Sequence, residues 1–255
     1  MGSYVDIAGH ATWVEEAGSG DETIVLLHGG FGNGDELLDT IGRPLAGAYR
    51  LLAPDRRGHG RTADTDAPFH YEDMVDETIA ILDQVVDGPA HLVGWSDGGI
   101  VALLLSRRRP ELVTRQVLIG TNFHHDGVRP IEMADDDPLG AAMYQAYVER
   151  TPDGADHFQV VMEKMMTLFA TEPTLTVDDL RQIPTPTLVL VGDDEVQELA
   201  HKVSLYESLP AGQLAVVPRA SHALPMEHPD EVARLIRDFL TADLPPVTLM
   251  PSRRR

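Results

Sequence analysis

Gly94-Trp95-Ser96-Asp97-Gly98-Gly99 is the stretch of sequence that decides the fold. It follows the apolar run 91–93 and precedes the apolar run 100–105, which predict a strand and a helix. Small neighbours let a serine occupy the strained backbone of a sharp strand-to-helix turn, with its hydroxyl projecting at the sheet edge. The motif in this context predicts Ser96 as a nucleophile; a plain structural turn is the alternative.

Outward from this motif, short apolar runs alternate with longer helical patterns. Two runs, 24–27 and 188–191, are continuously apolar, which is typical of strands covered on both faces. The alternation predicts an α/β fold with a mostly parallel eight-stranded sheet flanked by helices. The predicted strands are Tyr4–Ile7, Ala11–Glu15, Thr23–His28, Arg50–Pro54, Ala90–Trp95, Gln116–Gly120, Thr187–Gly192 and Gln213–Pro218.

Apolar residues at helical spacing mark the segments between the strands. Three such stripes predict the buried faces of three helices. Their members are Val75, Ile79, Leu82 and Val86; Val196, Leu199, Val203 and Tyr206; and Val232, Leu235, Ile236 and Phe239.

Residues 123–184 interrupt the alternation, because they contain no convincing strand. Helical patches at 141–148 and 158–169 instead predict a small helical cap inserted after the sixth strand, since a structureless loop of this length is uncommon in a compact domain. The core is then expected to comprise 1–122 and 185–255. We expect the cap to cover the pocket and to set substrate size.

His28-Gly29-Gly30-Phe31-Gly32 directly follows the third predicted strand. Glycines allow backbone N–H groups to approach a substrate oxygen closely. One such N–H, from Gly30 as first choice or Phe31 as second, would form an oxyanion hole with the N–H of Asp97.

His222 lies on the loop after the last predicted strand, where a sheet-based active site needs its general base. The orienting carboxylate is expected after the strand 187–191, within Asp193-Asp194-Glu195. The resulting chain order of serine, acid and histidine is the discriminating feature.

By these motifs the chain resembles the α/β-hydrolase superfamily over nearly its whole length. The matching pieces, in the family's order, are 28–30, 54–60, 94–98, 186–192 and 221–222. The resemblance implies an acid three residues after the strand's terminal glycine, at Glu195, where the family more often has Asp. Asp194 is therefore the alternative.

Serine at position 96 argues against dehalogenase and epoxide hydrolase chemistry, which this fold performs with a carboxylate nucleophile. The predicted function is hydrolysis of a small-molecule carboxylic ester or related acyl bond through an acyl-enzyme. Lactonases, amidases, C–C bond hydrolases and cofactor-free haloperoxidases or perhydrolases stay open. A non-catalytic, hydrolase-like ligand receptor is the alternative from another class.

The Trp-Ser-Asp-Gly-Gly sequence also resembles that of valacyclovir hydrolase-like enzymes, which cleave α-amino-acid esters. Asp97 could then hold a substrate ammonium group by a charge-assisted hydrogen bond. We therefore predict Asp97 and Trp95 as substrate-binding residues. In the other interpretation, Asp97 supplies only its backbone N–H.

Composition excludes several classes of partner. Asp and Glu number 41 against 20 Lys and Arg, for a net charge of −21, which disfavours nucleic acids and anionic membrane surfaces. The chain has no Cys, so thiolate chemistry is excluded. The first residues lack a signal-peptide pattern, and we expect a cytoplasmic protein with a small-molecule substrate. A homo-oligomer is compatible with the sequence.

No residue pattern predicts a metal ion or an organic cofactor. His124-His125-Asp126 is the one candidate, but adjacent histidines seldom converge on an ion, so we expect these residues to line the cap or the pocket. Arg56, Arg57 and His59 are expected to fix their loop rather than to bind an anion.

Overall fold

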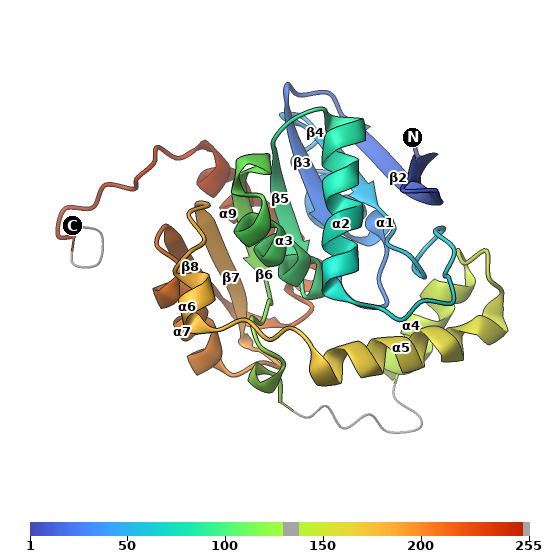
Figure 1. Ribbon diagram of the computed structural model, residues 1–255. Helices are drawn as coiled ribbons and strands as arrows, with labels where there is room; N and C mark the ends of the chain where they lie inside the picture. Colours follow the sequence, from blue (N-terminus) through green and yellow to red (C-terminus); the bar gives the residue numbers. More distant parts are fainter. Residues whose placement is uncertain (130–137, 252–255) are drawn as a thin grey trace.

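The computed structural model of the protein describes residues 1–129 and 138–251. Across these residues, eight strands form a single sheet (Figure 1). Each predicted run overlaps one strand, so the fold prediction is confirmed. The strands are β1 Ser3–Ile7, β2 His10–Gly18, β3 Glu22–Leu27, β4 Tyr49–Pro54, β5 Ala90–Trp95, β6 Val113–Ile119, β7 Thr187–Asp194 and β8 Gly212–Ser221.

The sheet runs in the order β1-β2-β4-β3-β5-β6-β7-β8. β1 pairs antiparallel with β2, and β2 antiparallel with β4, whereas every later pair is parallel. The continuously apolar runs are buried as expected of strands covered on both faces. Because β3, β5, β7 and β8 are parallel, the segments that follow them meet at one edge of the sheet.

Helices cover both faces of this sheet (Figure 1). Buried residues of α2, α3 and α7 join one apolar cluster, and those of α1, α8 and α9 join the other. Among the described residues, no helix combines the length and apolar character needed to cross a bilayer. The helices are α1 Gly34–Leu37, α2 Tyr71–Ile81, α3 Asp97–Arg108, α4 Pro138–Val148, α5 Phe158–Thr171, α6 Val177–Leu180, α7 Leu199–Ser208, α8 Leu224–Glu227 and α9 Pro229–Thr241.

Two of the three predicted helical stripes face the core, on α2 with its π-helical continuation Leu82–Val86 and on α9. The stripe predicted for α7 is wrong. Leu199 is 52% exposed, and the helix instead buries Lys202 and Leu205. The physical reason is that the Lys202 ammonium finds buried oxygen acceptors, which fixes a different face of α7 toward the core.

The long connection between β6 and β7 carries α4, α5 and α6, and α4 and α5 lie together beyond the end of the sheet (Figure 1). The side of α5 that bears Val161, Met165 and Leu168 is buried against the core. The structure thus has a helical cap after the sixth strand; its limits at 123 and 184 stay a prediction.

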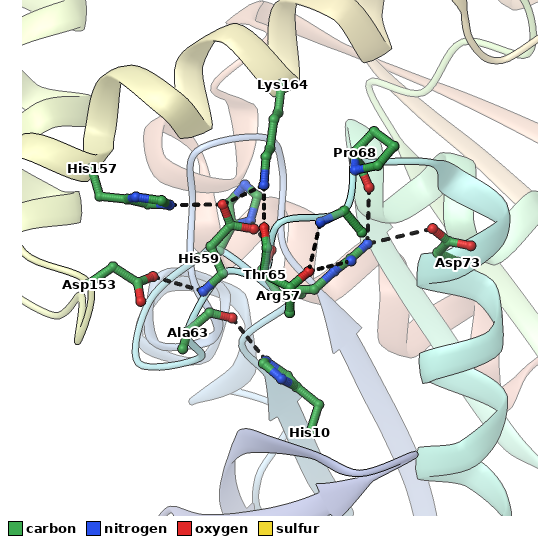
Figure 2. Close-up of polar contacts among 12 residues, drawn as sticks. His10, Arg57, His59, Ala63, Thr65, Pro68, Asp73, Asp153, His157 and Lys164 are labelled. Atoms are coloured by element: carbon green, nitrogen blue, oxygen red, sulfur yellow. Dashed lines mark hydrogen bonds and ion pairs between the residues drawn. The ribbon is translucent and has the colours of Figure 1, made fainter.

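An ionic cluster fastens this cap to the loop between β4 and α2 (Figure 2). Asp64 on the loop accepts hydrogen bonds from Lys164 Nζ at 2.7 Å and His157 Nε2 at 2.8 Å. The Asp64 amide donates to Asp153, and Lys164 also donates to the Thr65 carbonyl. Burial would raise the pKa of Asp64, but its bonds to Lys164 and His157 outweigh burial and lower it.

Candidate active site

Ser96 occupies the sharp turn between β5 and α3. Its φ of +52° and ψ of −115° lie in a region that non-glycine residues rarely adopt, at a cost of about 1–3 kcal/mol. Its amide donates to the Ile119 carbonyl, and its own carbonyl accepts from the Gly99 and Ile100 amides. The Ser96 side chain makes no helix-capping bond. The hydroxyl is therefore left to other partners.

The flanking glycines are required because the strand and helix approach each other closely. A Cβ on Gly98 would lie 1.9 Å from the Leu27 carbonyl oxygen, and one on Gly94 would lie 2.3 Å from the Gly98 carbonyl carbon. Only glycine fits these positions. The first turn of α3 consequently packs directly on the end of β3, beside the 28–31 loop.

His222, just after β8, bridges the serine and a carboxylate. Its Nε2 lies 3.0 Å from Ser96 Oγ, and its Nδ1 lies 2.5 Å from Glu195 Oε1. Because a carboxylate only accepts, Nδ1 carries the proton and Nε2 is free to accept the Ser96 hydroxyl proton. The structure thus brings together the three residue types that serine hydrolysis uses.

Of the two candidate acids, Glu195 is the one beside His222. Its side chain is 5% exposed, whereas Asp194 is exposed and lies opposite Ser221 in the β7–β8 ladder. Burial would raise the pKa of Glu195, but the hydrogen bond and charge of His222, and then the charge of Lys202, lower it overall. Glu195 is thereby favoured as a carboxylate.

Lys202, on α7, lies behind the acid and was not singled out from the sequence. Its side chain is completely buried, and its Nζ donates to the Thr121 carbonyl at 2.6 Å and to Gln197 Oε1. Burial lowers the pKa of Lys202 to about 7, although the charge of Glu195 opposes this. The available signal was a lysine in an apolar helix directly after the acid, in a chain with only two lysines.

Trp95 is half-buried beside the histidine. Its indole N–H donates a 2.8 Å hydrogen bond to the His222 carbonyl, and the two rings lie 5.8 Å apart. The other side of the ring packs on Gly29, where a Cβ would lie 2.8 Å from it. These contacts position His222; substrate binding by Trp95 stays a prediction.

Of the three amides predicted for the oxyanion hole, those of Gly30 and Phe31 lie in the loop after β3, and that of Asp97 begins α3. Gly30 lies against the Asp97 side chain, and Phe31 has a φ of +59°. Within residues 1–129 and 138–251, the N–H groups of Gly30, Phe31 and Asp97 make no hydrogen bond. Their role in binding a substrate oxyanion stays a prediction.

Asp97 is a buried carboxylate with one free oxygen. Its side chain is 3% exposed; Oδ1 accepts a 3.0 Å bond from the Tyr71 hydroxyl, while Oδ2 has no partner among the described residues. Burial raises the pKa of Asp97, against the opposing effects of Arg56 and Tyr71. Oδ2 lies beside Gly30, close to Met165 and Phe169 of the cap. Tyr71 gave no signal in the sequence, because its partner is brought to it only by the fold.

The basic residues after β4 fix their loop, as expected. Arg56 donates from its amide to His28 Nε2 at 3.1 Å and from its guanidinium to the Gly29 carbonyl at 3.0 Å. The Arg57 guanidinium donates hydrogen bonds to the Thr65 hydroxyl and to the Pro68 carbonyl (Figure 2). Burial, and then Arg56, lower the pKa of His59 to about 4, so it stays neutral.

His124, His125 and Asp126 form a compact group. Their ligand atoms lie within 4.8 Å of one another, and the two imidazoles stack at 4.5 Å. A 3₁₀ turn at His125–Gly127 brings these side chains together. His124 and Asp126 line a surface pocket of about 480 Å³, in agreement with a lining role.

The chain is similar to known hydrolases. Residues 24–235 match the family model of the alpha/beta hydrolase family. The mouse serine hydrolase BPHL is 25% identical over 249 residues, covering 89% of this chain and 81% of its own. A 2-hydroxymuconate semialdehyde hydrolase of Pseudomonas putida is 27% identical over 274 residues, covering 94% of both chains.

The fold is also that of solved hydrolase structures. The meta-cleavage product hydrolase CumD from Pseudomonas fluorescens IP01 superposes with a TM-score of 0.79 and 25% sequence identity, covering 94% of this chain and 97% of its own. The matched family model, the similar hydrolases and the eight-stranded sheet lead to one conclusion: the chain belongs to the alpha/beta hydrolase family and is a hydrolase.

Proposed function

We propose that the protein is a serine hydrolase that cleaves a carboxylic ester of a small molecule, with Ser96 as nucleophile, His222 as general base and Glu195 as the acid that orients it. The observation that carries the proposal is the continuous path of contacts from Ser96 Oγ to His222 Nε2, at 3.0 Å, and from His222 Nδ1 to Glu195, at 2.5 Å. Such a path activates a hydroxyl that is otherwise a weak nucleophile.

In this mechanism Ser96 Oγ attacks the ester carbonyl carbon as His222 Nε2 takes the hydroxyl proton. The amides of Asp97 and of Gly30 or Phe31 donate to the oxyanion. His222 then gives its proton to the leaving alcohol, and the acyl group stays on Ser96. Water, deprotonated by His222, hydrolyses the acyl-enzyme and restores the serine.

Fluorophosphonate labelling followed by intact-mass measurement tests the proposal. The wild type should gain one adduct, and Ser96→Ala should gain none. A folded wild type without an adduct would contradict the proposal and favour a ligand receptor.

A panel of p-nitrophenyl esters and lactones then defines the class of substrate. Turnover of 2-hydroxymuconate semialdehyde would favour C–C bond hydrolysis, and acetate-dependent bromination a perhydrolase.

A second candidate is hydrolysis of α-amino-acid esters. What favours it is the buried Asp97 Oδ2, which has no partner in the described part of the chain and lies next to the loop predicted to bind the oxyanion. A substrate ammonium would satisfy this oxygen by a charge-assisted hydrogen bond. The serine hydrolase BPHL is among the similar proteins.

Paired substrates test this second candidate. Phenylalanine and valine esters should lose at least about 10-fold in kcat/KM in Asp97→Asn, the size expected for one charge-assisted bond. The matching N-acetylated esters carry no ammonium and should change less than about 2-fold. An equal loss for both kinds of ester would mean that Asp97 stabilises the turn around Ser96 and does not bind the substrate ammonium.

The proposal also includes a small-molecule substrate, a cytoplasmic location and no nucleic-acid or membrane partner. The absence of nucleic-acid and membrane partners is proposed from the net charge of −21. Fractionation of the native host, followed by immunodetection, tests the location.

A further inference from the structure

Lys202 is a buried cation that the mechanism above does not use. Its side chain has no exposed surface, although an ammonium group is costly to remove from water. Only two oxygen atoms of the described residues, the Thr121 carbonyl and Gln197 Oε1, accept hydrogen bonds from its Nζ. Because a well-packed apolar residue would occupy such a place at lower cost, the lysine is expected to have a role beyond packing.

The two acceptors belong to segments that flank the His222–Glu195 pair. Thr121 follows Gly120, where a Cβ would lie 3.0 Å from His222 Nδ1 and 3.2 Å from Glu195 Oε2. Gln197 lies two residues after Glu195. The Lys202 ammonium therefore ties the segment after β6 to the segment after β7 at the point where the acid meets the histidine.

Charge complements this geometry. Glu195 Oε1 accepts from His222 and from the Val196 amide, but the buried Oε2 has no partner among the described residues. Lys202 is the lysine whose charge lowers the pKa of Glu195. The protonated Lys202 ammonium behind the acid offsets the cost of burying this carboxylate.

Among the described residues, His201 on the same helix is a further titratable group beside Lys202. Its Nε2 accepts from the Phe123 amide, and its ring stacks on Phe123 at 4.0 Å. Burial, then the charges of Lys202 and His124, lower the pKa of His201 to about 4. His201 is thus neutral near pH 6, and Lys202 supplies the positive charge on this side of Glu195.

We propose that Lys202 is a positioning residue for the acid: it holds the Thr121 and Gln197 segments together and keeps Glu195 ionised and aimed at His222. The role rests on the proposed function. In this proposal α7 affects catalysis through Lys202, which acts on Glu195 and touches neither Ser96 nor any reacting atom.

The first test measures the ionisation of Glu195 without requiring activity. The carboxyl carbons of ¹³C-Glu protein are titrated below pH 6, where Lys202 is still protonated, and the Glu195 signal is assigned by its loss in Glu195→Gln. In Lys202→Met the Glu195 titration should move to higher pH, and in Lys202→Arg it should return toward the wild type. An unchanged titration in Lys202→Met would overturn the proposal. Lys202→Gln, which keeps a polar group without the charge, repeats the comparison should the methionine variant not fold.

The second test is a double-mutant cycle on ester hydrolysis at pH 6. Lys202→Met should lower kcat about 10-fold with KM changed less than about 2-fold, and should have almost no effect in the Glu195→Gln background. An equal loss in both backgrounds would reduce Lys202 to a structural residue and overturn the proposal. A wild type that neither hydrolyses esters nor takes the fluorophosphonate would contradict the proposed function instead, and the titration would still decide whether Lys202 acts on Glu195.

Discussion

The indole N–H of Trp95 donates a 2.8 Å hydrogen bond to the carbonyl oxygen of His222. The residue immediately before Ser96 therefore holds the backbone of the residue that contacts the Ser96 hydroxyl. Ser96 and His222 are 126 positions apart in the chain, and β5 and β8, which precede them, are not neighbours in the sheet. The bond from Trp95 therefore holds two distant segments in a fixed position relative to each other. A shift of an ångström in such a relation has a large effect on rate.

Trp95→Phe should lower kcat about 10-fold with little change in KM, because it removes the N–H but keeps an aromatic ring beside Gly29 and His222. Trp13→Phe is the matched control, since the Trp13 indole N–H is buried without a partner among the described residues. Steady-state hydrolysis of a p-nitrophenyl ester measures both. Equal rates in the two variants would show that the bond to His222 has no part in catalysis.

Glu195→Gln should reduce kcat by about 10³-fold or more, because an amide no longer favours the imidazolium that forms on His222. Asp194→Asn changes the neighbouring carboxylate in the same way, but Asp194 is exposed and its variant should stay within about 2-fold of the wild type. Rapid-mixing measurements of the acylation rate compare them. A severe loss in Asp194→Asn alone would transfer the role to Asp194.

Glu36 should make stability depend on pH. Burial, opposed by the charge of Arg150 and a bond to the Asn33 backbone, raises the pKa of Glu36 from 4.5 to about 7. The folded protein therefore binds the Glu36 proton more tightly than the unfolded chain, and this group lowers stability as pH rises from 4.5 to 7. Because Glu36 is partly exposed, Glu36→Gln should gain about 1–2 kcal/mol over the wild type at pH 8 and almost nothing at pH 4.

Urea unfolding at pH 4, 6 and 8 measures that difference. Glu198→Gln removes an exposed carboxylate and serves as the control. A Glu36→Gln stability difference that does not vary with pH would show that Glu36 titrates as an ordinary carboxylate.

Asp64→Asn should loosen the cap, because it removes the acceptor charge shared by Lys164 and His157 (Figure 2). We expect a loss of about 1–3 kcal/mol in the free energy of unfolding at pH 7, since the Asp64 carboxylate is 1% exposed. The lowered pKa of Asp64 means that this stabilisation exists above the unfolded value of 3.8 and is lost as pH falls through the folded value.

Asp66→Asn, two positions along the same loop and exposed, is the control for Asp64→Asn. Limited proteolysis should cleave Asp64→Asn faster between 138 and 171 while leaving Asp66→Asn at the wild-type rate. Identical cleavage of both variants would mean that apolar packing by α5 alone holds the cap.

The sequence predicted those features that depend on local pattern. Runs of apolar residues located every strand, and the small residues around Ser96 predicted the sharp strand-to-helix turn. A Cβ on Gly98 would lie 1.9 Å from the Leu27 carbonyl oxygen, which shows why this turn needs glycine. The spacing alone did not decide whether Glu195 or Asp194 is the acid, because a shift of one residue in the loop determines which carboxylate faces His222. Tyr71 and Lys202 were missed since their partners, Asp97 and Thr121, come from distant segments.

The path of the chain between β6 and β7 has a consequence for how this protein can diverge. These strands are parallel neighbours, and such a crossover needs only about a dozen residues. The chain nevertheless inserts α4, α5 and α6 there. Doubling a loop adds only about 0.6 kcal/mol of closure cost. Loop-closure entropy therefore sets little limit on the length of the segment between Ile119 and Thr187, and the contacts of that segment with the core and with the Asp64 loop decide which changes the fold accepts.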